Sequence, residues 1–180
     1  MAAIRTHGAD LSIDEIAASA GVSKPVLYDE FGGKLGIADA IAVVLAEEVE
    51  RQVLATLADG GTFDIAVAVR AVVDGLVTLI DGEPALYAFL VRSIRSSDRG
   101  FLDNALVRVV HERASLLVEL LVPGVSPDRV EVLTDGVFGF LFGAVESWQA
   151  TRRLDKDALV TTLAVVIGEG FRAVTQLADE

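Results

Sequence analysis

The chain has 180 residues, of which 52% are hydrophobic, and its formal net charge is −12 at pH 7. One small domain cannot readily bury so much apolar surface, so we expect a subunit interface, an internal cavity, or both. The charge argues against a protein that wraps a polyanion but permits DNA binding through a small local footprint, and the absence of cysteine excludes disulfides and thiolate metal sites.

Helical periodicity dominates the chain, and no segment alternates convincingly like a β-strand. Clusters of glycine, proline and serine divide it into nine segments without an internal repeat, and the first three segments are short. We therefore predict an all-α fold, with a small N-terminal head at 1–36 and a larger helical body at 37–180. The predicted helices span residues 1–7, 12–19, 24–31, 34–58, 63–81, 84–95, 101–121, 127–151 and 156–177.

Nothing in the sequence predicts a membrane span. The longest apolar run, at 137–145, has nine residues, whereas a spanning helix needs about 20. No signal-peptide core precedes Asp10. We therefore expect a cytoplasmic protein that does not act at a membrane.

The segment that opens the second predicted helix contains dense helix-start signals. The Ser12 side chain can accept a hydrogen bond from the backbone of Glu15, whose side chain can reach back to Ser12, and this pair would form a capping box. Leu11 and Ile16 then stand at the positions of a hydrophobic staple. Gly21 suits the left-handed conformation that ends a helix.

A third short helix follows directly. Ser23 can cap it, and Pro25 falls in its first turn, where a missing N–H costs little. Two short helices joined by a three- to four-residue turn with a glycine form the helix-turn-helix of DNA-binding proteins. We expect a miniature core between these helices, made of Ile16, Ala20, Val22, Leu27 and Phe31.

Residues 11–34 resemble the DNA-binding signature of the TetR family. The resemblance rests on the capping box, the A-G-V-S turn at 20–23, the L-Y-x-x-F sequence at 27–31 and the G-x-K sequence at 32–34. The later chain matches the family only in the number and length of its helices. The resemblance implies a homodimer whose recognition helices enter successive major grooves of operator DNA, about 34–36 Å apart, and whose body binds a small-molecule effector.

The resemblance also assigns the DNA contacts. Lys24, Pro25 and Val26 would start the recognition helix and face the bases, where lysine can pair with guanine and the two apolar side chains can contact a thymine methyl. Tyr28 would donate to a phosphate. Lys34, with the free N–H groups that open the next helix, would hold another phosphate.

Two features depart from the family pattern. Family members usually have a longer first helix with basic residues ahead of it, whereas only residues 1–7 precede Gly8 here. Residues 1–36 also contain three Lys or Arg and five Asp or Glu, and two of these acids, Asp29 and Glu30, lie on the recognition helix. Both features bear on the affinity for DNA more than on the family assignment.

The helix predicted at 34–58 would join the head to the body. Apolar residues recur along it at every fourth position and form a stripe. One rigid helix shared by both parts can transmit movement between them. The stripe consists of Ile37, Ile41, Leu45, Val49, Val53 and Leu57.

Aromatic side chains suggest where the effector would bind. The family resemblance implies an apolar cavity in the body, with Phe89, Phe138 and Phe142 as candidate walls, although such residues are more often plain core. Arg92 could bind an acidic group of the ligand or form a salt bridge with Asp or Glu. Because the body is rich in Leu, Val and Phe, we expect an apolar or amphipathic effector.

Glycines inside the last two predicted helices indicate close helix packing. A glycine within a helix costs about 1 kcal/mol relative to alanine, and this cost is easiest to understand where another helix packs tightly. We interpret Gly139 and Gly143, together with Val166 and Gly170, as part of a four-helix dimer interface. The alternative is close packing within one subunit.

The sequence does not favour catalysis. His7 and His111 are the only histidines, and His111-Glu112 fits neither the Glu-x-x-His of di-iron bundles nor the His-Glu-x-x-His of zinc proteases. We expect no enzyme activity, metal or cofactor. The hypothesis is a dimeric DNA-binding regulator, in the usual family sense a repressor, that a small molecule releases from a partly palindromic operator. The alternative is an all-α dimeric ligand-binding or interaction protein that has lost DNA binding.

Overall fold

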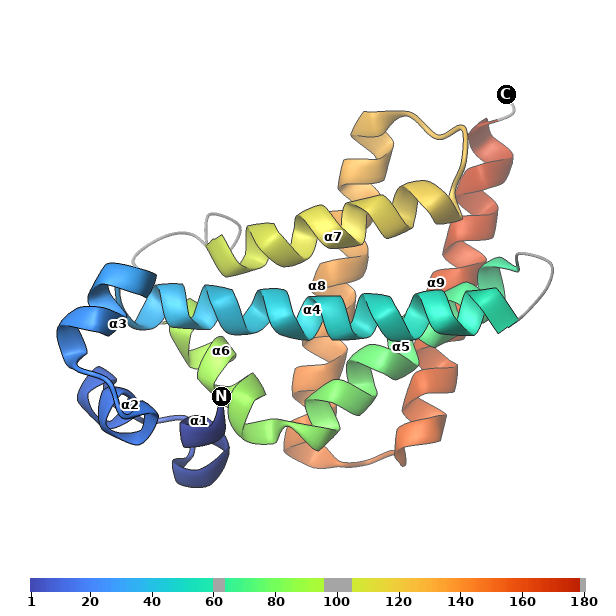
Figure 1. Cartoon of the computed structure of the whole chain (residues 1–180). Helices are drawn as coiled ribbons and strands as arrows, with labels where there is room; N and C mark the ends of the chain where they lie inside the picture. The colour runs from blue at the N-terminus through green and yellow to red at the C-terminus, as the bar shows by residue number, and fades with distance from the viewer. Residues whose placement is uncertain (60–63, 96–104, 179–180) are drawn as a thin grey trace. The chain divides into compact units, whose positions relative to one another are not determined.

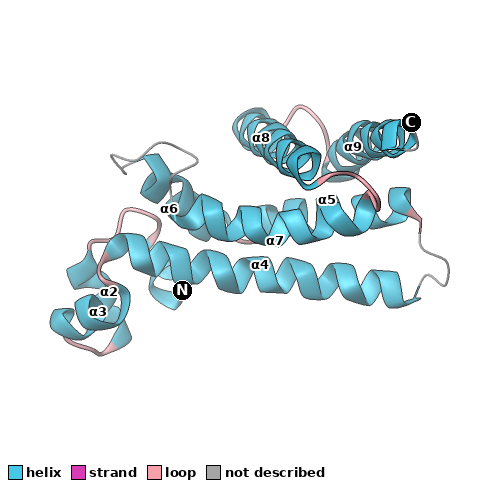
Figure 2. Ribbon diagram, turned by 90° about the horizontal axis from the view of Figure 1, so that it is seen from above, coloured by secondary structure: helices cyan, strands magenta, loops and turns pink. Residues whose placement is uncertain are grey.

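The computed structural model describes residues 1–59, 64–95 and 105–178, and every regular element in these ranges is an α-helix (Figure 2). The predicted all-α fold class is therefore confirmed. In chain order, as labelled in Figure 1, the helices are α1 (Ala2–His7), α2 (Ile13–Ala20), α3 (Lys24–Phe31), α4 (Lys34–Asp59), α5 (Ile65–Gly82), α6 (Pro84–Arg95), α7 (Ala105–Leu121), α8 (Pro127–Thr151) and α9 (Lys156–Ala178).

The observed helix ends lie within two residues of the predicted ones wherever the described residues test them. Helices α3, α6 and α8 begin and end where the sequence predicts. The predicted starts at residues 63 and 101 lie outside the described residues. The agreement has a local cause, because Gly21 and Gly32 follow α2 and α3 with φ of 70° and 69°, a conformation that glycine adopts at little cost.

The chain folds into two compact units, and each is built from two segments. The first unit contains Met1–Glu47 and Gly82–Val110, and the second contains Glu48–Asp81 and His111–Glu180. The first unit therefore includes α6 in addition to the helices of the predicted head, and α4 contributes to both units. The functional boundary at residue 36 stays a prediction, because compactness alone does not locate a function.

One hydrophobic core unites α1, α2, α3, the start of α4 and α6 in the first unit. The largest of its fully buried side chains are Ile4, Leu86 and Phe89, which are at most 1% exposed, so α6 supplies two of these three. Burying a large apolar side chain stabilises a fold by about 1.5–3 kcal/mol relative to leaving it in water. The other buried members are Ala3, Leu11, Ile16, Ala17, Leu27, Ile37, Ala38 and Ile41.

The miniature core expected for the helix-turn-helix is only partly right. Ile16 and Leu27 are buried, and Phe31 packs half-buried against the core. Ala20 and Val22 are exposed instead. Since α4 and α6 contribute Ile37, Ile41, Leu86 and Phe89 to the same core, α2 and α3 do not have to bury the turn that joins them.

Helices α5, α8 and α9 supply much of the core of the second unit, and α8 and α9 lie side by side in both views (Figures 1 and 2). On α5, Val69, Val73 and Val77 stand one turn apart and are at most 2% exposed, as expected of an apolar helix stripe. Trp148, near the end of α8, donates from its Nε1–H to the carbonyl oxygen of Leu154 at 2.9 Å. This bond ties the connection between α8 and α9 to the core.

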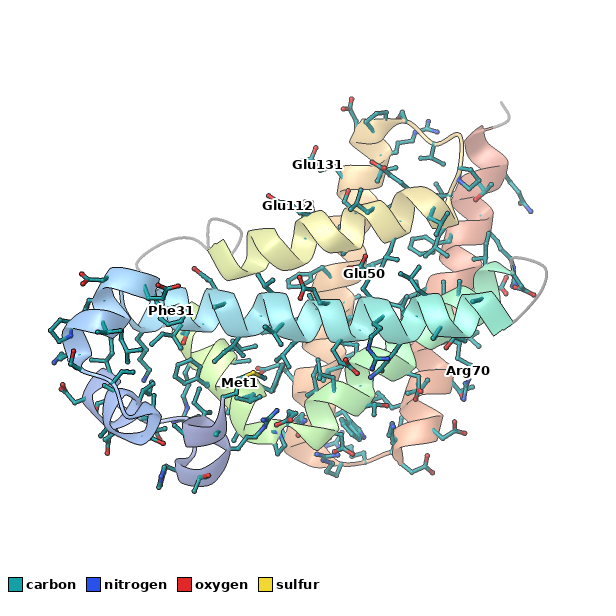
Figure 3. The ribbon with its side chains drawn as sticks, in the orientation of Figure 1. Met1, Phe31, Glu50, Arg70, Glu112 and Glu131 are labelled. Carbon is teal, nitrogen blue, oxygen red and sulfur yellow. The ribbon has the colours of Figure 1, made fainter. Side chains whose placement is uncertain are left out.

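Polar contacts also join α5 to α9 within the second unit. The guanidinium group of Arg70, labelled in Figure 3, donates to the carboxylate of Asp157 at 2.6 Å and to the hydroxyl of Thr161 at 2.8 Å. Both contacts are exposed, and exposed ion pairs contribute little to stability. They therefore add little to the packing free energy of these two helices.

Among the described helices, α9 is long and apolar enough over Lys156–Gln176 to cross a membrane, by length and composition alone. The count of unbroken apolar runs missed this helix because Thr161, Thr162, Glu169 and Arg172 interrupt its apolar residues. Glu169 and Arg172 form an ion pair with each other. The core helix of an ordinary folded protein meets the same criterion. Helix α9 has such a buried face, which includes Leu163, Ile167 and Phe171.

Candidate nucleic-acid interface

Helix α2 begins with the predicted capping box. The backbone N–H of Glu15 donates to the Ser12 hydroxyl oxygen at 3.3 Å, and the Glu15 carboxylate accepts from the backbone N–H of Ser12 at 2.8 Å. The Ser12 hydroxyl also donates to this carboxylate at 2.7 Å. These hydrogen bonds favour the ionised form and lower the pKa of Glu15 below its ordinary value. Local sequence alone therefore determines where α2 starts.

The turn between α2 and α3 has the geometry that a helix-turn-helix requires. The N–H of Gly21 donates to the carbonyl of Ala18 at 3.2 Å, and the N–H of Val22 donates to the carbonyl of Ala17 at 3.1 Å. These bonds satisfy carbonyl groups that the end of a helix would otherwise leave unpaired. Ser23 stands at the N-cap of α3 as predicted, but its side chain makes no capping hydrogen bond.

Helix α3 presents the predicted reading residues to solvent. Lys24, Pro25 and Val26 are all exposed, and Val26 is 50% exposed although it is apolar. Leu27, only 6% exposed, anchors the opposite side of the helix in the core of the first unit. The major groove offers a partner for each kind of side chain, because guanine presents hydrogen-bond acceptors for a lysine and thymine presents a methyl group for an apolar residue.

The Lys24 side chain is already paired within the first unit. Its Nζ lies 2.9 Å from Oδ2 of Asp14, which stands in the first turn of α2. The hydrogen bond to this carboxylate raises the pKa of Lys24 above its ordinary value. Asp29 and Glu30 are exposed on α3. The sequence gives no sign of the Asp14 contact, because a pair ten residues apart across a turn follows no helical spacing.

Close packing sets the connection between α3 and α4. A Cβ on Gly36 would overlap the carbonyl oxygen of Phe31, the residue labelled at the end of α3 in Figure 3. A Cβ on Gly33 would lie 3.5 Å from the ring of Tyr28, and Gly33 has φ of 130°. The structure therefore holds the Tyr28 ring against the residue that precedes Lys34. No role was expected for Gly33 or Gly36, although three glycines within five residues were the available signal.

Tyr28 and Lys34, the two predicted phosphate contacts, thus lie at the same connection. Tyr28 is 48% exposed, and Lys34 is exposed at the first position of α4. The ammonium group of Lys34 stands over the ring of Phe89, 5.2 Å from its centroid. A cation at this distance is attracted by the face of the ring. The reading residues therefore lie in the first turn of α3, whereas the phosphate residues lie at Tyr28, in the second half of α3, and at the first position of α4.

Two further cations bind carboxylates within the first unit. Arg5 of α1 makes a bidentate contact with Glu83, which precedes α6, and its shortest N–O distance is 2.6 Å. This contact lowers the pKa of Glu83 below its ordinary value. Arg92 of α6 forms an ion pair with Asp10, so the structure contains the salt bridge that the sequence left as the alternative to ligand binding. Both guanidinium groups are therefore already paired with carboxylates of the first unit, and neither was among the predicted DNA contacts.

The candidate ligand residues fall into different units. Phe89 is fully buried in the core of the first unit, which also holds Arg92. Phe138 and Phe142 belong to the second unit, where their rings stack on α8 with centroids 6.3 Å apart. Within neither unit does the structure bring all four residues together. Their role in ligand binding stays a prediction.

The candidate dimer residues lie on an exposed face of α8 and α9. A Cβ placed on Gly139, Gly143 or Gly170 would meet no atom within 4 Å, and Val166 is 53% exposed. Within the described part of the chain, therefore, these glycines do not serve close packing inside the subunit. We call this surface the α8–α9 face, and its exposed members include Gly136, Gly139, Phe140, Gly143, Val165, Val166 and Gly170.

Comparison with known proteins finds a family whose sequence model matches the helix-turn-helix. The sequence model of the bacterial regulatory proteins of the tetR family matches residues 1–41. Proteins named as uncharacterized HTH-type transcriptional regulators in two strains of Mycobacterium tuberculosis are each 26% identical over 168 residues, which cover 91% of this chain and 70% of the relative. Both names describe regulators of transcription.

Solved structures share the fold over nearly the whole chain. The fatty acid degradation regulator FadR from Bacillus halodurans is 20% identical with a TM-score of 0.66, and the match covers 94% of each chain. A tetR family transcription regulator from a Shewanella species is 15% identical with a TM-score of 0.62, over 89% of this chain and 86% of that one. The similarity extends to the body, for which the sequence matched only in the number and length of the helices.

Proposed function

We propose that the chain, whose residues 1–41 match the sequence model of the tetR family of bacterial regulatory proteins, is a cytoplasmic homodimeric repressor of this family. It binds a partly palindromic operator and is released by a small apolar or amphipathic molecule. The observation that carries the proposal is α3, whose predicted base-reading residues are exposed while Leu27 anchors its other side. A helix held in this way can enter a major groove without disturbing the core.

Each DNA contact has a defined task in this proposal. Lys24 donates to guanine, and Pro25 and Val26 contact thymine methyl groups, so these residues read sequence. Tyr28 and Lys34 hold phosphates and set the register of the protein on the duplex. Their position at one connection, with the Tyr28 ring against Gly33, supports a shared phosphate contact at the end of α3.

The α8–α9 face supplies the dimer contact. Bare glycines with free space above them let the helices of a second copy approach closely, and the exposed apolar side chains between them gain from burial. A two-fold interface uses the same surface on both copies. The two α3 helices then face one palindromic site, with half-sites about 34–36 Å apart.

Effector release requires that the ligand prefer a conformation in which the two α3 helices are wrongly spaced for DNA. Thermodynamic reciprocity then makes operator DNA weaken ligand binding by the same factor. A long-chain fatty acid is the first probe to test, because the similar Bacillus halodurans protein is a regulator of fatty acid degradation. A sugar and a nucleotide serve as polar comparisons.

A salt-dependent gel shift tests the function. Purified protein is mixed with duplex DNA that flanks its own gene, and with a scrambled duplex of equal length and composition. We expect tighter binding to the flanking DNA and a steep loss of affinity as salt rises. Binding to neither duplex at low salt would favour the alternative, a dimeric ligand-binding protein without DNA affinity, which the acidic head and its internally paired lysine also favour to some degree.

A further inference from the structure

The cationic side chains of the first 36 residues each have a partner within the first unit. Arg5 binds Glu83 and Lys34 stands over the ring of Phe89. Lys24 binds Asp14, and this is the contact that involves a predicted base-reading residue. Both side chains of the pair remain accessible to a ligand, since the Lys24 side chain is 44% exposed and that of Asp14 is 64% exposed.

The ion pair changes what Lys24 can attract. A lysine ammonium group has three N–H donors, and one of them is directed to the Asp14 carboxylate at 2.9 Å. Because the pair is neutral as a whole, it attracts a phosphate only weakly, and the carboxylate repels one directly. The two remaining donors can still bond to the O6 and N7 acceptors of guanine, because the base as a whole is neutral.

We propose that Asp14 is a specificity-determining residue, which suppresses binding of Lys24 to phosphates while leaving its contact with a neutral base edge. This inference rests on the proposed function, because it needs a DNA-bound α3. Asp14 thereby lowers the affinity for arbitrary DNA more than the affinity for the operator. The acidic residue on α2 acts through Lys24 and does not itself contact the DNA.

The test uses Asp14→Asn in the full-length protein. Fluorescence anisotropy measures binding to the flanking duplex and to a scrambled duplex, between about 50 and about 200 mM salt. We expect the variant to bind the scrambled duplex about two- to fivefold more tightly, a gain of the size typical for releasing an exposed ion pair. Its salt slope on this duplex should steepen by about 0.9, the value for one additional phosphate contact. Affinity for the flanking duplex should change less.

Two matched variants isolate the role of Lys24. Asp29→Asn removes the same charge from the neighbouring helix, and Asp29 forms no ion pair with any residue in the described ranges. Asp14→Asn is also combined with Lys24→Met, which removes the ammonium group but keeps an unbranched side chain. We expect Asp29→Asn to have the smaller effect, and we expect Asp14→Asn in the Lys24→Met background to have no larger effect than Asp29→Asn. Circular dichroism checks that each variant is folded, and Asp14→Gln provides a second neutral side chain.

The outcomes separate this inference from the function on which it rests. If the wild-type protein binds neither duplex, the proposed function and the role of Asp14 both fall. If the wild-type protein binds DNA but Asp14→Asn and Asp29→Asn raise the affinity for the scrambled duplex equally, the proposed role of Asp14 is wrong and the proposed function stands. If the full gain of Asp14→Asn persists without the Lys24 ammonium group, the specificity role is likewise overturned, because the gain is then a long-range charge effect.

Discussion

The start of α3 and the α8–α9 face both expose apolar residues, but their surroundings differ. On α3 the apolar Val26 follows two positions after Lys24, which is bound by an acid of the preceding helix. On the α8–α9 face, glycines with free space alternate with exposed Phe140, Val165 and Val166. The cores of protein–protein interfaces are depleted of charged residues, whereas a surface that binds DNA presents cationic and polar side chains. The first therefore suits reversible DNA contact and the second a permanent subunit contact.

The largest expected effect is on the α8–α9 face. Gly143→Leu adds a side chain that meets no atom within the described part of the subunit but fills the space a second copy would use. Overpacking costs about 1–3 kcal/mol and would occur in both copies of a symmetric dimer. Sedimentation velocity should show monomers or unfolded protein, since obligate dimers often lack a stable monomer.

A glycine at the end of a different helix provides the control. A Cβ on Gly82, the last residue of α5, would also meet no atom within 4 Å, and Gly82 belongs to the first unit whereas the α8–α9 face belongs to the second. Gly82→Leu should leave the sedimentation of the protein unchanged. If Gly143→Leu sediments as a normal dimer at low concentration, the contrast between the two surfaces is lost and the dimer interface lies elsewhere.

The next effect concerns two neighbours on α8 that should behave differently. Leu141 is buried, and Leu141→Ala should lower the free energy of unfolding by about 2–5 kcal/mol. Phe142 is only half-buried and stacks on Phe138, so Phe142→Ala should cost less than the roughly 3–5 kcal/mol of a fully buried phenylalanine. Thermal unfolding measures both losses.

The ligand response then decides the role of Phe142. If this residue lines the effector site, Phe142→Ala should change effector affinity while operator binding without ligand stays nearly intact. Leu141→Ala controls for general loosening of α8. A large loss of stability with an unaltered ligand response would make Phe142 an ordinary core residue and remove the main support for this position of the site.

A smaller effect is expected at the end of α3. Lys34→Ala and Tyr28→Ala should each weaken binding to all DNA sequences alike, because phosphates carry no sequence information. Lys34→Ala should also lower the salt slope by about one. Lys156→Ala, which removes a lysine that pairs with Asp74 in the second unit, is the charge-matched control. Unchanged affinity and slope in both test variants would mean that the phosphate contacts lie elsewhere.

The smallest effect concerns the capping box. Ser12→Ala should reduce stability by about 1 kcal/mol, the usual contribution of an N-cap serine. Because the folded state lowers the pKa of Glu15 below its ordinary value of 4.5, the contribution of Glu15 is present above that value and is lost as pH falls through the lower folded pKa. Urea unfolding from pH 7 to pH 3 should therefore show a weaker pH dependence for Glu15→Gln than for the wild type. Equal pH dependence would show that Glu15 does not contribute in this way.

Local chemistry determined most of the helix boundaries. The capping box at Ser12, the left-handed Gly21 and Gly32 and the proline in the first turn of α3 act within a few residues, so the sequence alone predicts them. The exposure of Lys24, Pro25, Val26 and Tyr28 followed in the same way, because Leu27 and Phe31, one turn apart, define the side of that helix that faces the core.

Contacts between distant segments could be decided only by the tertiary structure. Three examples are the ion pair of Lys24 with Asp14, the position of the Lys34 ammonium group over the Phe89 ring, and the carbonyl oxygen of Phe31 that leaves no room for a Cβ at Gly36. The spacing of these residues in the sequence follows no helical periodicity. The same is true of α6, which the sequence assigned to the body but whose Leu86 and Phe89 complete the core of the first unit. An apolar stripe predicts that one face of a helix is buried, but the neighbouring helix that covers this face is known only from the three-dimensional packing.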